Sequence, residues 1–108
     1  MSGVAFENQM VIWLKSQGYE AVAKTEYFDM GIDILASKEG IRYGIQVKRS
    51  KQPVGVAAIR AAVTGLNSYQ CDRAMVITNS TFTYKALKLA KDNDCALING
   101  TDLIAKLF

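Results

Sequence analysis

Apolar residues recur along the chain with two spacings, one helical and one typical of strands. Between residues 4 and 17, Phe6, Met10, Trp13 and Leu14 return every three or four positions, which predicts an amphipathic helix that Gly18 ends. Later stretches predict helices over residues 54–69, 83–93 and 101–108. Alternating or continuous apolar runs predict strands over residues 19–27, 32–37, 41–49, 73–79 and 95–98.

Polar residues and one proline mark where the later helices begin. Pro53 lies close to the start of the second helix. Ser80 or Thr81 is expected to cap the third helix, and Asn99 or Thr101 to start the last one. Four polar residues near the end of the fourth strand would contact a bound nucleic acid or serve as caps: Thr78, Asn79, Ser80 and Thr81.

The order of these elements, α-β-β-β-α-β-α-β-α, predicts an α/β fold built on a mixed sheet. The first three strands would form an antiparallel meander, and right-handed crossovers would add parallel strands. Residues 73–79, RAMVITN, form a continuous apolar strand of the kind buried on both faces, so helices should cover both faces of the sheet. One proline, no repeat and no low-complexity run indicate a single domain over residues 1–108.

The composition narrows the chemistry. Histidine is absent from the 108 residues, which excludes Ser-His-Asp and Cys-His catalysis and most zinc sites. A metal would need oxygen ligands, as magnesium, manganese and calcium do. Cys71 and Cys95 have no metal-binding spacing and are interpreted as free thiols of a cytosolic protein. Neither a membrane span nor a secretory signal is expected, because no apolar run approaches about 20 residues and the first residues lack a basic stretch.

Positive charge is concentrated in one part of the chain, although the net charge is only +3. From residue 38 to residue 60, a single acid, Glu39, accompanies six basic residues: Lys38, Arg42, Lys48, Arg49, Lys51 and Arg60. Such a stripe favours binding of a polyanion. The alternative is a solvated strand end and helix start with no ligand.

The second and third strands are separated by a short turn, which determines how their side chains pair. If Glu39 and Gly40 form a two-residue turn, Asp33 lies opposite Gln46. Alternation then puts Lys48 on the same face as both. Because directly opposed Cβ atoms lie about 4.5–5.5 Å apart, Asp33 and Gln46 would share one bound ion.

The same register divides the remaining residues of this hairpin between two faces. Gly44 would leave the face of Asp33 open, and the opposite face would be filled by Ile32, Ile34, Ile45 and Val47. A one-residue slip in the turn would move Asp33 to that opposite face. Asp29, Met30 and Gly31 would form a bulge that re-aims the chain before Asp33.

These residue types match the needs of phosphodiester hydrolysis. Asp33 and Gln46 offer oxygen ligands to a hard cation. Lys48 would stabilise charge on a bound phosphate and orient or help to deprotonate the attacking water. The alternative is a polar sheet face on which Lys48 extends into solvent. Glu7 borders the apolar stripe of the first helix and would add a second acid, although the helix dipole also favours an acid there.

Two segments, FDMGIDILA (28–36) and GIQVKRS (44–50), resemble the D–QxK form of the PD-(D/E)XK nuclease signature. The chain is most similar to the Mrr-type restriction endonuclease-like group, which is related in fold to archaeal Holliday-junction resolvases. Asp33, Gln46 and Lys48 match this signature, and Glu7 resembles the glutamate of helix one. The resemblance covers nearly the whole chain and implies a restriction-endonuclease-like three-layer αβββαβ core with a mixed sheet and flanking helices.

The resemblance also implies roles for these residues. Asp33, Gln46 and the Val47 carbonyl would hold Mg²⁺, for which Mn²⁺ would substitute, and Glu7 would support the metal through water. Lys48 would serve the water and the scissile phosphate. Asp29 matches an acid of the glycine-rich lead-in, whereas Met30 replaces a glycine of many relatives. Gln46 replaces an acid, which removes one negative charge and should weaken metal binding.

The function that the resemblance implies is that of a Mg²⁺-dependent DNA endonuclease of restriction, repair or junction-resolving type. The enzyme would act as a homodimer. It would be a cytoplasmic protein encoded by a prokaryote or a phage. Candidate DNA contacts are Arg42, Tyr43, Arg49, Lys51 and Arg60. A larger protein partner would supply target recognition. The alternative is a catalytically weak or inactive nuclease-fold module that binds DNA or a protein partner.

Overall fold

A computed structural model describes residues 3–23 and 31–105 of the chain. The helices in these ranges are α1 (Gly3–Ser16), α2 (Val56–Gly65), the 3₁₀ helix η1 (Asn67–Tyr69), α3 (Tyr84–Asp92) and α4 (Gly100–Ala105). The strands are β1 (Glu20–Ala23), β2 (Ile34–Lys38), β3 (Ile41–Lys48), β4 (Arg73–Thr78) and β5 (Ala96–Ile98). Asp29 and Met30, the centre of the expected bulge, lie outside the described residues.

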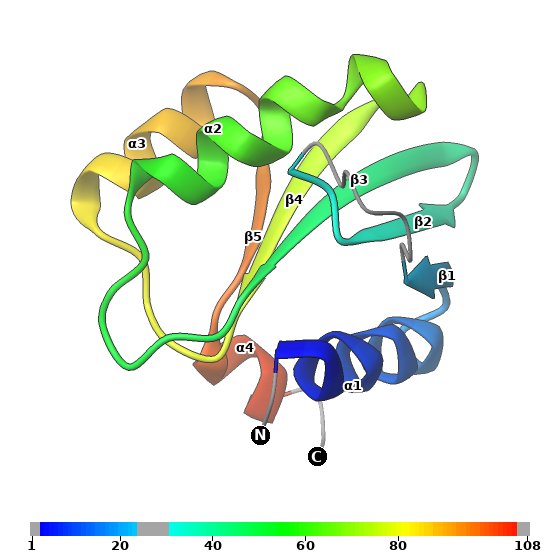
Figure 1. Cartoon of the computed structure of the whole chain (residues 1–108), viewed down its shortest axis with the longest axis horizontal. Helices are drawn as coiled ribbons and strands as arrows, with labels where there is room; N and C mark the ends of the chain where they lie inside the picture. Colours follow the sequence, from blue (N-terminus) through cyan, green and yellow to red (C-terminus); the bar gives the residue numbers. More distant parts are fainter. Residues whose placement is uncertain (1–2, 24–30, 106–108) are drawn as a thin grey trace.

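The strands within the described ranges form one sheet in the order β1-β2-β3-β4-β5. The first three strands pair antiparallel, and β3, β4 and β5 pair parallel, which confirms the expected mixed sheet. Helix α1 covers one face, and α2 with α3 covers the other (Figure 1). Helix α4 packs on the side of α1 through Leu103. The α/β layering predicted from the order of elements is therefore present.

The β2–β3 hairpin has the expected register. Glu39 and Gly40 form its turn, and both have left-handed backbones, with φ of 54° and 81°. Two positive φ values are typical of the two-residue turn whose twist matches that of the strands it joins. Lys38 pairs with Ile41 and Ile34 with Ile45, as predicted.

The hydrophobic core differs on the two faces of the sheet. Under α1 it contains large side chains, among them Phe6, Trp13 and Leu14. Under α2 and α3 it is built mainly from small ones, including Ala62, Ala74, Ala86 and Ala90. Small side chains allow these helices to approach the strands closely.

The face assigned to Ile32 and the open space expected over Gly44 both require correction. Ile32 is fully buried, and its Cδ1 lies 2.9 Å from where a Cβ on Gly44 would stand. Leu66 and Cys71 also border that position. Ile32 therefore lies on the face of α2 rather than with Ile34, because it precedes β2 and escapes strand alternation. The space above Gly44 is filled by these side chains.

Helix ends agree with the sequence at some positions and not at others. Gly18 ends α1 with a φ of 92°. Asn99 caps α4, because its Oδ1 accepts from Asp102 N at 2.8 Å. The cap of α3 is Thr83 rather than Ser80 or Thr81, and its Oγ1 accepts from Ala86 N at 3.1 Å. The helical pattern over residues 54–69 divides into α2 and η1.

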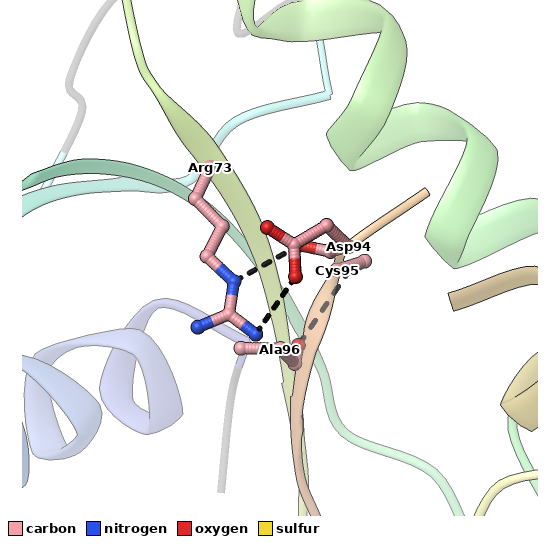
Figure 2. Close-up of polar contacts among 4 residues, drawn as sticks. All are labelled: Arg73, Asp94, Cys95 and Ala96. Atoms are coloured by element: carbon pink, nitrogen blue, oxygen red, sulfur yellow. Dashed lines mark hydrogen bonds and ion pairs between the residues drawn. The ribbon is translucent and has the colours of Figure 1, made fainter. Parts of the chain in front are cut away.

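The two cysteines are free thiols, as expected. Figure 2 shows the surroundings of Cys95: Arg73 Nε donates to the Asp94 carbonyl at 2.9 Å, and its guanidinium lies 3.4 Å from the Asp94 carboxylate. The Cys95 thiol faces the Ala96 carbonyl, and burial raises its pKa from 9.0 to about 11. Burial also raises the pKa of Cys71, while nearby Arg42 lowers it. Both thiols are thus predominantly protonated at neutral pH.

Over residues 3–23 and 31–105, no helix has the length and apolar character needed to cross a membrane.

Candidate active site

The aspartate of the signature is held at the edge of β3 by backbone contacts. Gly31 has a φ of 79°, and a Cβ there would lie 2.3 Å from the Ala61 carbonyl oxygen, so the chain passes against α2 at this glycine. Two residues later, Asp33 N donates to the Ile45 carbonyl at 2.7 Å. Asp33 Oδ2 accepts from Val47 N at 2.7 Å, and the residue is only 8% exposed. The carboxylate is therefore buried and oriented.

Gln46 and Lys48 project from β3 on the face of α2. Their neighbours Ile45 and Val47 belong to the core under α1, so alternation directs Gln46 and Lys48 the other way. Both line a cavity of about 290 Å³ whose far wall is the first half of α2 and the residues that precede it. Gln46 is half-buried, and Lys48 is exposed where the strand ends. The glutamine thus lies deeper in this cavity than the lysine.

Asp33 is linked to the carboxyl-terminal part of β3, the strand that carries Gln46 and Lys48. Asp33 binds the N–H of Val47, the residue that separates Gln46 from Lys48. In an antiparallel hairpin the N–H and C=O of one residue point to the same neighbouring strand, so the Val47 carbonyl is directed to the side of Asp33. The expected pairing of Asp33 with Gln46 lies outside the strand register, which ends at Ile34 and Ile45, and Asp33 N instead donates to the Ile45 carbonyl.

The donor set suits a hard cation. One carboxylate, one amide oxygen and one backbone carbonyl are the oxygen ligands that Mg²⁺ and Mn²⁺ accept. Over residues 3–23 and 31–105, no three His, Cys, Asp or Glu residues form a group that could hold a metal. The residues therefore fit a metal in kind, with less negative charge than a cluster of acids would supply.

Glu7 is carried by the helix on the opposite face of the sheet. Its neighbour Phe6 is buried in the core under α1, and Glu7 itself is half-buried. Gln46 and Lys48 lie on the face of α2. Glu7 is therefore carried by a different element from Gln46 and Lys48, and its role at the site stays a prediction.

The sequence profile of the Mrr catalytic domain, described as a restriction endonuclease, matches residues 1–107. The chain belongs to this restriction endonuclease family. Among curated proteins, none matches the chain.

Solved structures confirm the restriction-endonuclease-like fold. AF1548, a protein of unknown function, superposes with a TM-score of 0.77 at 19% identity, over 93% of this chain and 64% of its own length. The DNA modification-dependent restriction endonuclease AspBHI gives 0.75 at 13% identity, over 93% of this chain and 29% of its own. The Holliday junction resolvase Hjc of Archaeoglobus fulgidus gives 0.53 at 20% identity, over 76% and 70%. The chain thus spans less than two thirds of AF1548 and of AspBHI.

Two of the candidate DNA contacts, Arg42 and Tyr43, belong to the first half of β3, away from the end of the strand at Lys48 in this Mrr-type domain. Arg42 is at the start of β3, about 20 Å from Lys48 at the strand rise of about 3.3 Å per residue. Its guanidinium donates to the Tyr69 carbonyl at 3.2 Å. Tyr43 is 8% exposed, and its ring packs edge-on against Tyr19 with centroids 5.5 Å apart. The phosphate contact expected at Tyr43 stays a prediction, and little of this residue is exposed for it.

Burial also affects an ionisable side chain at this far end of β3. It raises the pKa of Tyr19, and the proximity of Tyr43 adds to that rise. Lys38 Nζ lies 5.0 Å from the Tyr19 ring centroid and donates to the Gln17 carbonyl at 2.8 Å. The cations at this end therefore have structural contacts.

The other candidates lie around the signature residues. Arg49 and Lys51 follow Lys48 and line a cavity of about 620 Å³ with Ser50 and Asn79. Arg60 is exposed on α2 and lines a cavity of about 420 Å³ together with Gly31. The sequence does not single out Ser50, because a serine after a strand has no distinctive pattern.

Proposed function

We propose that this domain is a Mg²⁺-dependent DNA endonuclease that hydrolyses phosphodiester bonds at the carboxyl end of β3. The observation that carries the proposal is the 2.7 Å hydrogen bond from Val47 N to Asp33 Oδ2, which fixes the buried carboxylate to the backbone of the residue that separates Gln46 from Lys48 in the sequence. Membership of the restriction endonuclease family supports the reaction class. The sequence motif and the contact point to the same residues.

Each residue would have a separate role. Asp33, the Gln46 amide oxygen and the Val47 carbonyl would hold Mg²⁺, or Mn²⁺ in its place. When bound, the metal would supply Lewis-acid stabilisation of the phosphate. Lys48 would hold a non-bridging phosphate oxygen and orient the attacking water. Glu7 would act through water from the other side of the strand end.

The DNA backbone would run along the cations near this site, Arg49, Lys51 and Arg60, with Arg42 as an outlying contact. We expect a homodimer, since one site cuts one strand and two related sites would cut both. The chain covers 29% of the length of AspBHI, which is a DNA modification-dependent restriction endonuclease. Target selection by a further domain or a protein partner fits such a relationship.

The second candidate function is a nuclease-fold module that binds DNA or a protein and cleaves weakly or not at all. Gln46 in place of an acid favours it, because the site then has one negative charge fewer to attract a divalent cation. A cleavage assay separates the two candidates.

The test is a panel of linear, methylated, supercoiled and four-way DNA with Mg²⁺, Mn²⁺ or no metal. We expect Asp33→Asn and Lys48→Met each to lower cleavage by about 10²-fold or more. The control for the first is Asp72→Asn, because Asp72 also accepts a β3 backbone N–H, that of Arg42 at 2.9 Å, but at the far end. Lys38→Met controls for the second.

Circular dichroism would verify that each variant folds. Cleavage retained in folded Asp33→Asn would refute the assignment of the site. Absence of cleavage by the wild type on every substrate, with DNA binding intact, would favour the binding module.

A further inference from the structure

The segment that follows β3 is fastened to the segment that follows β4. Ser50 N donates to Asn79 Oδ1 at 2.8 Å, and the Ser80 hydroxyl donates to the Gln52 carbonyl at 2.9 Å. The two loops run side by side on the left of Figure 1. The path of the chain after Lys48 is therefore determined by contacts with β4's loop.

Ser50 stands between two cavities. It lines the cavity of about 290 Å³ that contains Gln46 and Lys48. It also lines the cavity of about 620 Å³ whose other lining residues are Arg49, Lys51 and Asn79. The two cavities are thus neighbours along the direction in which the chain leaves β3.

The second cavity offers cations and hydrogen-bond donors, and within residues 3–23 and 31–105 no acid lines it. The orientation of the Asn79 amide follows from its contact, because only the oxygen of an amide can accept the Ser50 N–H. The NH₂ group, with two donors, is consequently turned away from Ser50. Arg49 and Lys51 are both exposed. This chemistry fits a phosphate group.

We propose that the cavity of Arg49, Ser50, Lys51 and Asn79 binds the DNA phosphate adjacent to the scissile one. Asn79 has two functions there: its oxygen positions the loop through Ser50, and its NH₂ group donates to the phosphate. The identity of the ligand as DNA rests on the proposed function. The subsite would set the direction in which a strand leaves Lys48.

The test measures binding of a fluorescein-labelled duplex in the absence of metal, by fluorescence anisotropy. Asn79→Asp keeps an oxygen acceptor for Ser50 N–H but replaces the NH₂ donor by a negative oxygen. We expect its Kd to rise about tenfold or more, the typical effect of losing a hydrogen bond to a charged group. Asn67→Asp, on η1 at the opposite end of the sheet, makes the same change in net charge and should alter Kd less than about twofold.

A second variant tests the same subsite through exposed residues, so it does not depend on the fold of the loop. Arg49→Gln with Lys51→Gln should reduce the slope of log K against log salt by about 2, since each phosphate contact contributes about 0.9. The matched control, Lys85→Gln with Lys88→Gln on α3, should leave the slope unchanged.

Equal weakening by Asn79→Asp and Asn67→Asp would overturn the proposal, because the effect would then come from net charge alone. An unchanged salt slope in the Arg49 and Lys51 variant would also overturn it. These outcomes are separable from failure of the proposed function: the expected binding pattern without any cleavage would refute the nuclease and leave the subsite supported.

Discussion

The two faces of β3 use the same strand for different purposes. Toward α1, Tyr43, Ile45 and Val47 are buried among large apolar side chains. Toward α2, Gly44, Gln46 and Lys48 alternate with them, beside a helix that packs through alanines. The first face supplies apolar burial and thus stability. The second gives up some of that burial and leaves a polar cavity where the strand ends.

The comparison indicates how a small domain accommodates a polar site. Close packing on the α2 face is achieved by glycine and alanine near Gly31 and Ala61, so the helix lies near the strands without filling the space at their ends. The large residues under α1 anchor the same strand from behind. Large apolar side chains and candidate chemical groups of β3 thereby lie on opposite faces of the strand.

The largest loss of stability is expected at Gly31, where the chain passes close to the backbone of α2. Gly31→Ala should lower the free energy of unfolding by about 3 kcal/mol or more, because the residue has a positive φ and its Cβ would overlap the Ala61 carbonyl. Gly40→Ala is the control, since Gly40 has a φ of 81° with no atom within 4 Å. It should cost about 1–2 kcal/mol. Equal losses in urea unfolding would mean that helix α2 does not need this approach.

The next effect contrasts adjacent residues on opposite faces. Ile45→Ala should cost about 2–5 kcal/mol, because Ile45 is fully buried under α1. Gln46→Ala, one position along the strand, should cost less than about 1 kcal/mol, because the side chain is half-buried beside a cavity. Chemical denaturation of both variants measures the difference. A larger loss at Gln46 would show that the polar face contributes to the core after all.

A third change sharpens the chemical side of the comparison. Gln46→Glu adds one negative charge beside Asp33, and we expect the Mg²⁺ affinity to rise about fivefold or more, since a charge pair near a surface is worth about 1–4 kcal/mol. Mn²⁺ binding followed by electron paramagnetic resonance reports this without reference to cleavage. Asp72→Glu, which alters an acid at the far end of β3, should have no effect. An unchanged affinity in Gln46→Glu would place the metal elsewhere.

The smallest effect is expected at Cys95, which is buried in the core under α2 and α3. The pKa of Cys95 is about 11 in the folded protein against 9.0 for an unburied thiol. The Cys95 thiol thus holds its proton more strongly in the folded state than in the unfolded state. The stability that this difference contributes is fully present below pH 9 and is lost as pH rises toward 11. At pH 10 the wild type should have lost about 1 kcal/mol more than Cys95→Ala. Urea unfolding under reducing conditions at pH 8 and 10 checks this, and parallel losses in both proteins would contradict it.

Much of the fold was predictable because local signals and global packing agree. The hairpin register followed from a two-residue turn and strict alternation, and Glu39 accepts a positive φ to make that turn. Thr83 was missed as the cap of α3 because Ser80 and Thr81 fit the same capping pattern. In the folded chain these two residues make other contacts: the Ser80 hydroxyl donates to the Gln52 carbonyl, and the Thr81 carbonyl accepts from Val54 N. Tyr43 was named as a candidate phosphate contact from the sequence, and its packing against Tyr19 and the core under α1 became evident only in the tertiary structure.

The amino-acid sequence by itself determined the order of elements, the pairing of β2 with β3 and the signature Asp33, Gln46 and Lys48, since these depend on neighbours within one hairpin. Tertiary structure alone decided that Asp33 binds the Val47 N–H, that Ile32 covers Gly44, and that Asn79 holds Ser50. Those contacts join segments whose separation in sequence is bridged only when the sheet and helices assemble. Periodicity reports which face a side chain occupies, but not which distant atom meets it there, because that depends on how closely the elements pack.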